Sequence, residues 1–195
     1  MIQIHTWTLG LYQTNCYIVH AEGSKSCVVI DPGYDANTIL GRAALLGLEV
    51  EAILLTHGHF DHVGAVAALA ADTDCRVFLK EEELSLPAAM TAGPLFYTDL
   101  YEGGSLTIAG MDIRILHTPG HTPGSVCLLI GDAMFSGDTL FAGSMGRCDF
   151  PGSNLMDMRQ SLKKLRALPG DYRVFPGHAE ATTLEFERKT NPYLR

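Results

Sequence analysis

The stretch from Thr56 to His62 (THGHFDH) constrains this chain more than any other, because it places three histidines and an aspartate within six residues. It follows an apolar run over 52–55, which is typical of a buried strand, and precedes an alanine-rich run over 63–70, which is typical of a helix. The cluster therefore lies on a loop that leaves the carboxyl end of a strand. Open α/β sheets tend to bind their ligands at this end.

The spacing within this loop indicates metal binding. His57 and His59 are two residues apart, so in an extended segment both imidazoles point to the same side. Asp61 and His62 follow after the chain begins to turn and can point elsewhere. Four such side chains exceed what one ion with an open catalytic position needs, so the spacing predicts two neighbouring ions. The alternative is a loop that is polar by chance, but imidazole is the commonest metal ligand and the loop concentrates it.

The same stretch resembles the T-H-x-H-x-D-H signature of the metallo-β-lactamase-fold hydrolases. Three later segments, each at the end of an expected strand, continue the likeness: 117–125 (HTPGHTPGS), 135–140 (FSGDTL) and 175–178 (FPGH). The ligands that the resemblance implies are His57, His59 and His121 for one ion, Asp61, His62 and His178 for the other, and Asp138 as a bridge between them. It also assigns Asp61 and Asp138 a catalytic role.

The resemblance covers nearly the whole chain and implies an α+β fold. This fold is a four-layer αββα sandwich, in which two mixed β-sheets lie face to face with helices outside. We expect residues 1–195 to form one such domain, in keeping with the length. We also expect the chain to lack the C-terminal helical region that helps to hold glutathione in full-length glyoxalase II.

Local patterns agree with this architecture. Strands are expected over 2–9, 15–21, 26–30, 52–55, 76–80, 105–108, 111–116, 125–130, 133–136 and 173–175. Helices are expected over 35–46, 63–70, 155–168 and 182–190, and a short solvent-exposed helix over 81–86. Residues 88–104 are expected to form a long connection over one rim of the site, with aromatic side chains that pack rather than form a wall for substrate.

Several residues outside the ligand set have a structural interpretation. His5, His20 and His117 are read as structural residues in strands or at their ends. Asp31, in an Asp-Pro-Gly turn, is either a turn residue or a hydrogen-bond partner of a metal-ligating histidine. The five cysteines form no metal or redox motif, so they are expected to be free thiols, with Cys148 serving in packing.

Composition excludes some functions. The net charge is −8 and no block of basic residues occurs, which argues against binding to nucleic acid or to an anionic membrane surface. The first residues show no signal-peptide pattern, and no apolar run is long enough to span a membrane. We therefore expect a cytoplasmic protein.

A further likeness narrows the function. Residues 141–153 (FAGSMGRCDFPGS) resemble the G-S-x-G-R-x-D-F-P pattern of short bacterial relatives of glyoxalase II, the hydroxyacylglutathione hydrolases. The resemblance implies hydrolysis of a small-molecule thioester by a metal-bound hydroxide on two divalent ions. Zinc suits the ligands, and iron or manganese are compatible with them. Arg147 is expected to hold a substrate carboxylate, unless it only pairs with Asp149.

Two other activities stay open at this point. Persulfide dioxygenases share the fold, most of the histidines and the G-R-x-D-F stretch, but use a single iron and oxygen. Lactonases and other hydrolases of the same fold are a further alternative. The ligand residues alone do not separate these activities.

Overall fold

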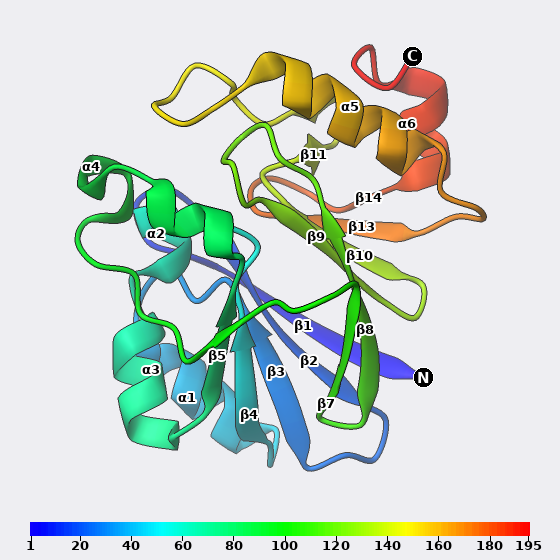
Figure 1. The fold of residues 1–195 in the computed structure, drawn as a ribbon. Coiled ribbons are helices and arrows are strands. Elements are labelled where there is room, and N and C mark those ends of the chain that lie inside the picture. Colours follow the sequence, from blue (N-terminus) through cyan, green and yellow to red (C-terminus); the bar gives the residue numbers. More distant parts are fainter.

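The computed structural model describes residues 1–195 and contains two six-stranded β-sheets packed face to face (Figure 1). In the first sheet, β1 to β3 are antiparallel and β3 to β6 are parallel. Its strands, in spatial order, are β1 (Ile2–Leu9), β2 (Thr14–Ala21), β3 (Ser26–Ile30), β4 (Glu49–Leu54), β5 (Arg76–Leu79) and β6 (Asp99–Leu100). Its outer face is covered by α1 (Ala36–Leu45) and α3 (Val66–Thr73).

The second sheet is mainly antiparallel, with one parallel pair between β10 and β13. Its strands, in spatial order, are β14 (Thr182–Thr183), β13 (Arg173–Pro176), β10 (Ala133–Gly137), β9 (Val126–Ile130), β8 (Met111–His117) and β7 (Ser105–Ile108). α5 (Leu155–Arg166) and α6 (Leu184–Thr190) lie outside it (Figure 1). The remaining elements are α2 (Phe60–Val63), a 3-10 helix over Glu81–Ser85, α4 (Ala88–Thr91), and the hairpin of β11 (Leu140–Phe141) and β12 (Ser144–Met145).

Side chains of the central strands alternate between the two faces of their sheet, so each strand packs against two neighbouring layers. In β3, Val28 and Ile30 face the second sheet, whereas Cys27 and Val29 face α1 and α3, because successive side chains of a strand point to opposite faces. All four side chains are fully buried. Each fully buried valine or isoleucine contributes about 1.5–3 kcal/mol relative to an exposed one. The four-layer αββα sandwich predicted from the sequence is therefore confirmed.

The fourth layer follows from the sequence of α5. Asn154 caps this helix, since its Oδ1 accepts hydrogen bonds from the N–H groups of Met156 at 2.8 Å and Asp157 at 3.2 Å. Leu162 and Leu165 pack on the second sheet together with Met158, at helical spacing. The basic side chains of its last turn suit the negative end of the helix dipole.

Several expected elements differ in the structure; β4, for example, begins at Glu49 and not at residue 52. The helix expected over 63–70 begins later, as α3, and a separate short helix, α2, ends at Val63; between them the Ala65 N–H donates to the carbonyl of Pro32 and does not continue the first helix. The final helix begins two residues later than expected, since Thr183 ends β14 and caps α6. The short helix over 81–86 is not wholly exposed, because the side chain of Glu83 is fully buried.

Most other structural expectations are confirmed. Cys16, Cys27, Cys75 and Cys127 are buried free thiols, and Cys148 is half-buried against the cluster beneath α5. Within 88–104, the expectation that the aromatic side chains pack is confirmed only for Tyr101, which lies in the core and donates to the carbonyl of Leu55; it is wrong for Phe96 and Tyr97, which are exposed. None of the helices is both long enough and apolar enough to cross a membrane.

Candidate metal centre

The seven predicted ligands come together at one edge of the sandwich, where loops of both sheets meet. The first sheet supplies four of them through the segment that follows β4, and the second sheet supplies three from the ends of β8, β10 and β13. These are, in order, His57, His59, Asp61 and His62, then His121, Asp138 and His178. The prediction that they lie at strand ends is confirmed for both sheets.

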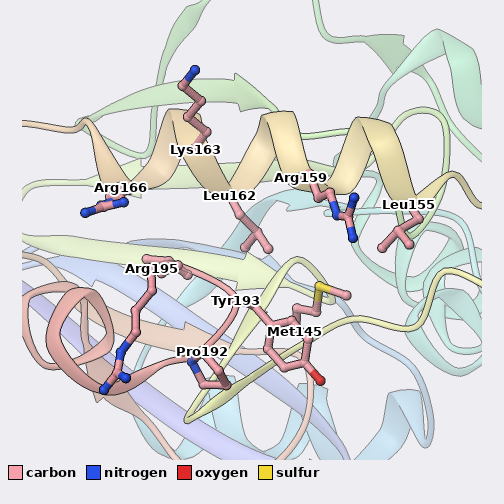
Figure 2. Close-up of a pocket in the computed structure, with 10 residues that line it drawn as sticks. Met145, Leu155, Arg159, Leu162, Lys163, Arg166, Pro192, Tyr193 and Arg195 are labelled. Atoms are coloured by element: carbon pink, nitrogen blue, oxygen red, sulfur yellow. The ribbon is translucent and has the colours of Figure 1, made fainter.

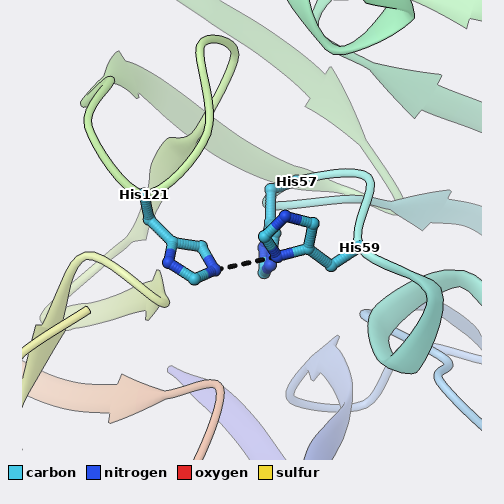
Figure 3. A group of neighbouring side chains, drawn as sticks. All are labelled: His57, His59 and His121. Carbon is cyan, nitrogen blue, oxygen red and sulfur yellow. Dashed lines mark hydrogen bonds between the residues drawn. The ribbon is translucent and has the colours of Figure 1, made fainter. Parts of the chain in front are cut away.

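The first group consists of His57, His59 and His121. One ring nitrogen from each of the three lies within 4.8 Å of the others. Nδ1 of His59 is 2.9 Å from Nε2 of His121, and the ring of His57 lies beside both (Figure 3). All three side chains are buried. The two loops that carry them approach from opposite sheets, so this group depends on how the sheets are packed.

The second group consists of Asp61, His62 and His178. Oδ2 of Asp61 lies 3.3 Å from Nε2 of His178 and 3.7 Å from Nε2 of His62. Asp138 stands between the two groups. Its Oδ1 is 3.5 Å from Nε2 of His62, and its Oδ2 is 3.4 Å from Nε2 of His121. A carboxylate in this position can contact ions in both groups, as its predicted bridging role requires.

Hydrogen bonds orient the histidine rings through the ring nitrogen that faces away from the ligand cluster. Four of them use Nδ1 toward the protein: His57 to the Thr56 hydroxyl at 3.0 Å, His62 to Asp31 at 3.0 Å, His121 to the Arg147 carbonyl at 2.9 Å, and His178 to the Tyr12 carbonyl at 3.1 Å. Because a carbonyl oxygen can only accept, Nδ1 of His121 and His178 carries the proton. Their Nε2 lone pairs then face the cluster, as metal ligation requires.

Several nitrogen and oxygen atoms of the predicted ligands lack a hydrogen-bond partner and are suited to bind a cation. Buried polar atoms are normally hydrogen-bonded. Four buried atoms of the predicted ligands have no hydrogen-bond partner: Nε2 of His57, His59 and His62, and Oδ1 of Asp138, although His59 faces His121 through its other nitrogen, Nδ1. Imidazole nitrogen and carboxylate oxygen are suitable ligands for zinc, iron and manganese. The residues present therefore fit one or more divalent metal ions.

Asp31 supports this cluster from behind. Its buried carboxylate accepts hydrogen bonds from the Thr56 N–H at 2.8 Å, from the Thr56 hydroxyl at 2.6 Å and from Nδ1 of His62. Asp31, His57 and His62 are also close enough to hold an ion. Both oxygens of Asp31 already accept bonds from ligand-bearing residues, so we assign it the supporting role. Of the two interpretations of Asp31, the histidine partner is confirmed.

The charges of the two groups differ in the metal-free protein. Burial lowers the pKa of His59 to about 4 and holds the pKa of His57 well below its usual value. Burial also acts to lower the pKa of His62, but Asp138, Asp31 and Asp61 outweigh it and raise that pKa to about 9. The first group is therefore neutral and ready to bind a cation near neutral pH. His62 carries a proton that an entering cation must displace.

Arg147 lies at the rim and is exposed. Its guanidinium makes a two-pronged ion pair with Asp149, at 2.9 and 2.8 Å, and lies 4.2 Å from the centre of the Phe150 ring. Phe150 in turn lies edge-on to His59 and His121. The ion pair with Asp149, which was the alternative to substrate binding, is present in the structure. Binding of a substrate carboxylate by Arg147 stays a prediction.

Sequence reasoning missed two residues at the start of β2. The hydroxyl of Thr14 donates to Oδ2 of Asp61 at 3.1 Å. The Asn15 side-chain amide donates to the carbonyls of Pro176 at 3.1 Å and Ala179 at 2.9 Å, and so fixes the loop that carries His178. A threonine and an asparagine at a strand end carry no recognisable signal, because their partners are distant in sequence.

Two cavities could accept a ligand, and they differ in their position relative to the predicted metal centre. One of about 550 Å³ lies between α5 and the C-terminal segment, away from the predicted ligands. Arg159 and Leu162 point from α5 toward Met145 and Tyr193, whereas Lys163 points away (Figure 2). The other cavity, of about 290 Å³, adjoins Asp61 and is lined by apolar side chains that include Tyr12, Tyr34 and Phe60. Only the second cavity touches the predicted metal centre.

Two known proteins are similar to this chain over most of its length. Hydroxyacylglutathione hydrolase GloC of Haemophilus influenzae is 34% identical over 199 residues, which cover 94% of this chain and 93% of that protein. The probable polyketide biosynthesis zinc-dependent hydrolase BaeB of Bacillus velezensis is 32% identical over 170 residues, covering 87% of this chain and 74% of that protein.

Solved structures agree with the fold over the whole chain. The B3 metallo-beta-lactamase BLEG-1 superposes with a TM-score of 0.88 at 35% identity, covering 100% of this chain and 99% of that one. TTHA1623 in a di-iron-bound form gives 0.82 at 40% identity, with 97% and 100% covered. ETHE1 from Myxococcus xanthus gives 0.84 at 28% identity, with 97% and 83% covered.

The match to a known family spans the sheets and the site together. Residues 9–178 match the family described as the Metallo-beta-lactamase superfamily, and this range runs from the end of β1 to the last predicted ligand, His178. The match thus includes every loop that contributes to the two ligand groups. With its two facing sheets and a histidine–aspartate cluster that suits divalent cations, the chain belongs to the metallo-beta-lactamase superfamily.

Proposed function

We propose that this protein is a two-metal hydrolase that cleaves a small-molecule thioester. The observation that carries the proposal is the set of buried, partnerless nitrogen and oxygen atoms on side chains of both ligand groups. The similarity to GloC over nearly the whole chain supports a hydroxyacylglutathione hydrolase-like reaction. Zinc suits this ligand set, and the di-iron form of TTHA1623 makes iron the first alternative.

The chain's own residues would have distinct tasks in this reaction. His57, His59 and His121 would hold one ion, and Asp61, His62 and His178 the other. Asp138, which lies between the two groups, would contact both. Ions held this way supply a Lewis acid for the carbonyl and lower the pKa of a water to near neutrality. The apolar cavity beside Asp61 can accept the uncharged part of a substrate.

The other candidate is an enzyme like the persulfide dioxygenases. The structural similarity to ETHE1 supports it. Such an enzyme would use a single iron and oxygen in place of two metal ions. The two candidates differ in what they consume. Hydrolysis releases a thiol from a thioester without oxygen, whereas persulfide oxidation takes up oxygen and requires iron.

A paired assay tests the proposal. Purified protein loaded with zinc, or with iron, is offered S-lactoylglutathione and glutathione persulfide separately, while thiol release and oxygen uptake are recorded. We expect thiol release from the thioester without oxygen uptake. Oxygen uptake with persulfide, dependent on iron and without thioester cleavage, would instead establish the dioxygenase-like function.

A further inference from the structure

A carboxylate outside the ligand set is buried beside the first ligand group. Glu83 lies in the 3-10 helix Glu81–Ser85, between β5 and α4, and its side chain is fully buried. Its neighbours in the run of three glutamates differ from it: Glu81 is exposed and Glu82 pairs with Lys80. No lysine, arginine or histidine forms an ion pair with Glu83. Burying an unpaired carboxylate is costly, so its contacts must explain its position.

The two oxygens of Glu83 join the two loops that carry the first group. Oε2 accepts a hydrogen bond from the Gly58 N–H at 2.5 Å, and Gly58 is the residue between His57 and His59. Oε1 accepts one from the Gly124 N–H at 2.6 Å, and Gly124 lies three residues after His121. One loop belongs to the first sheet and the other to the second. A single side chain therefore connects the two sheets directly behind the three histidines.

The glycines at both contact points permit this close approach. A Cβ at Gly124 would lie 2.7 Å from Cγ of Glu83, and one at Gly58 would lie 3.1 Å from its Oε2. The small residues and the buried carboxylate thus fit each other on both loops. Hydrogen bonds to an ionised acceptor are about twice as strong as those between neutral groups, which offsets part of the burial cost.

We propose that Glu83 is a positioning residue for the first metal ion. Its carboxylate fixes the distance between the loop of His57 and His59 and the loop of His121. The inference rests on the two-metal function proposed above, but it concerns affinity for metal and not the identity of the substrate.

The test uses Glu83→Gln, which keeps the shape of the side chain. The amide has one oxygen, so it can serve only one of the two backbone N–H groups and presents its own N–H₂ to the other. We expect affinity for zinc at the first site to fall at least tenfold, while the second site binds as before. The measurement is competition for zinc with a chromophoric chelator, starting from metal-free protein. His121→Ala provides the reference for loss of the first site.

The matched control is Glu81→Gln, which makes the same change on an exposed residue of the same 3-10 helix. It should leave both zinc affinities unchanged. If Glu83→Gln lowers the melting temperature but binds both ions as tightly as the wild type, Glu83 is only structural and the inference is wrong. If the wild type binds two ions but cleaves no thioester, the proposed function fails while the positioning role stands.

A milder pair of variants keeps the inference testable if Glu83→Gln does not fold. Glu83→Asp keeps both carboxylate oxygens but is one methylene shorter, so it cannot serve both backbone N–H groups, whereas Glu82→Asp makes the same change on a neighbour that pairs with Lys80. Glu83→Asp should weaken the first site severalfold, and Glu82→Asp should not. Equal zinc affinity in both variants and the wild type would overturn the inference.

Discussion

Replacing Asp31 by asparagine should weaken metal binding without removing any ligand. The Asp31 carboxylate accepts from Nδ1 of His62 and, through the Thr56 hydroxyl, from Nδ1 of His57. It thereby keeps the protons on the outer nitrogens and leaves Nε2 of both rings toward the cluster. In Asp31→Asn, one oxygen can still accept from the Thr56 N–H. The new amide N–H₂ then faces donors, so His62 is driven to carry its proton on Nε2.

The magnitude follows from the lost hydrogen bond. A hydrogen bond to a charged acceptor contributes about 1.5–3 kcal/mol, and a proton on Nε2 must be moved before that atom can bind metal. Since 1.4 kcal/mol corresponds to a factor of ten, affinity for zinc should fall by about 10–100-fold. This agrees with the usual effect of changing the partner of a metal-ligating histidine, also about 10–100-fold. The zinc affinity of the second site, which contains His62, should fall more than that of the first site.

The assay is zinc titration of metal-free protein against a chromophoric chelator. Asp35→Asn is the matched control, because Asp35 is an exposed helix cap four residues away and asparagine also serves as a cap. It should change neither zinc affinity. Two unchanged affinities in Asp31→Asn, in a protein that folds normally, would refute the orienting role of Asp31.

Four further outcomes are expected. Elemental analysis of protein freed of loose metal should give about two ions per chain, and a firm value near one with full activity would contradict the two-metal proposal. Asp138→Ala should reduce the content of both ions, whereas His121→Ala should chiefly empty one site, as the same analysis would show. Urea unfolding of metal-free protein should show stability falling as pH drops from about 6.5 toward 4. The reason is that the pKa of His59 is lowered to about 4 in the folded state, so the unfolded chain binds more protons in this range; a flat profile would argue against a neutral, buried imidazole. Arg147→Ala should raise KM for thioesters that carry a carboxylate and spare neutral ones, with unchanged metal content; equal losses on both, with a lower melting temperature, would show that its pairing with Asp149 only stiffens the loop.

The ligand set could be predicted from the sequence because each member has a local signal. Each predicted ligand lies at or just after the end of an expected strand, often beside glycine or proline, and the strand pattern brings such ends to one edge. Glu83 could not be predicted in this way. Its partners are the amides of Gly58 and Gly124, which lie 25 and 41 residues away. Three consecutive glutamates at a helix start are already explained by the helix dipole, so the pattern gives no reason to single out Glu83, the last of the three.

The division of α2 from α3 escaped prediction for a similar reason. The residues over 63–70 are rich in alanine, and the break falls at Gly64 and Ala65, where the Ala65 N–H donates to the carbonyl of Pro32. Thr14 and Asn15 likewise act through contacts between β2 and the loop of His178. The sequence thus predicted what strand ends present to the site, but not the side chains that hold those ends together.

The origin of the ligands in both sheets links the stability of the fold to the supply of metal. Neither sheet alone supplies a complete set of ligands, so if two ions bind as proposed, loss of either sheet would release both to solution. By mass action, each tenfold rise in free metal above the dissociation constant adds about 1.4 kcal/mol per bound ion to the free energy of unfolding, or about 2.8 kcal/mol for two. In a metal-poor environment the folded population therefore declines together with activity, and the abundance of the protein should follow the concentration of its metal.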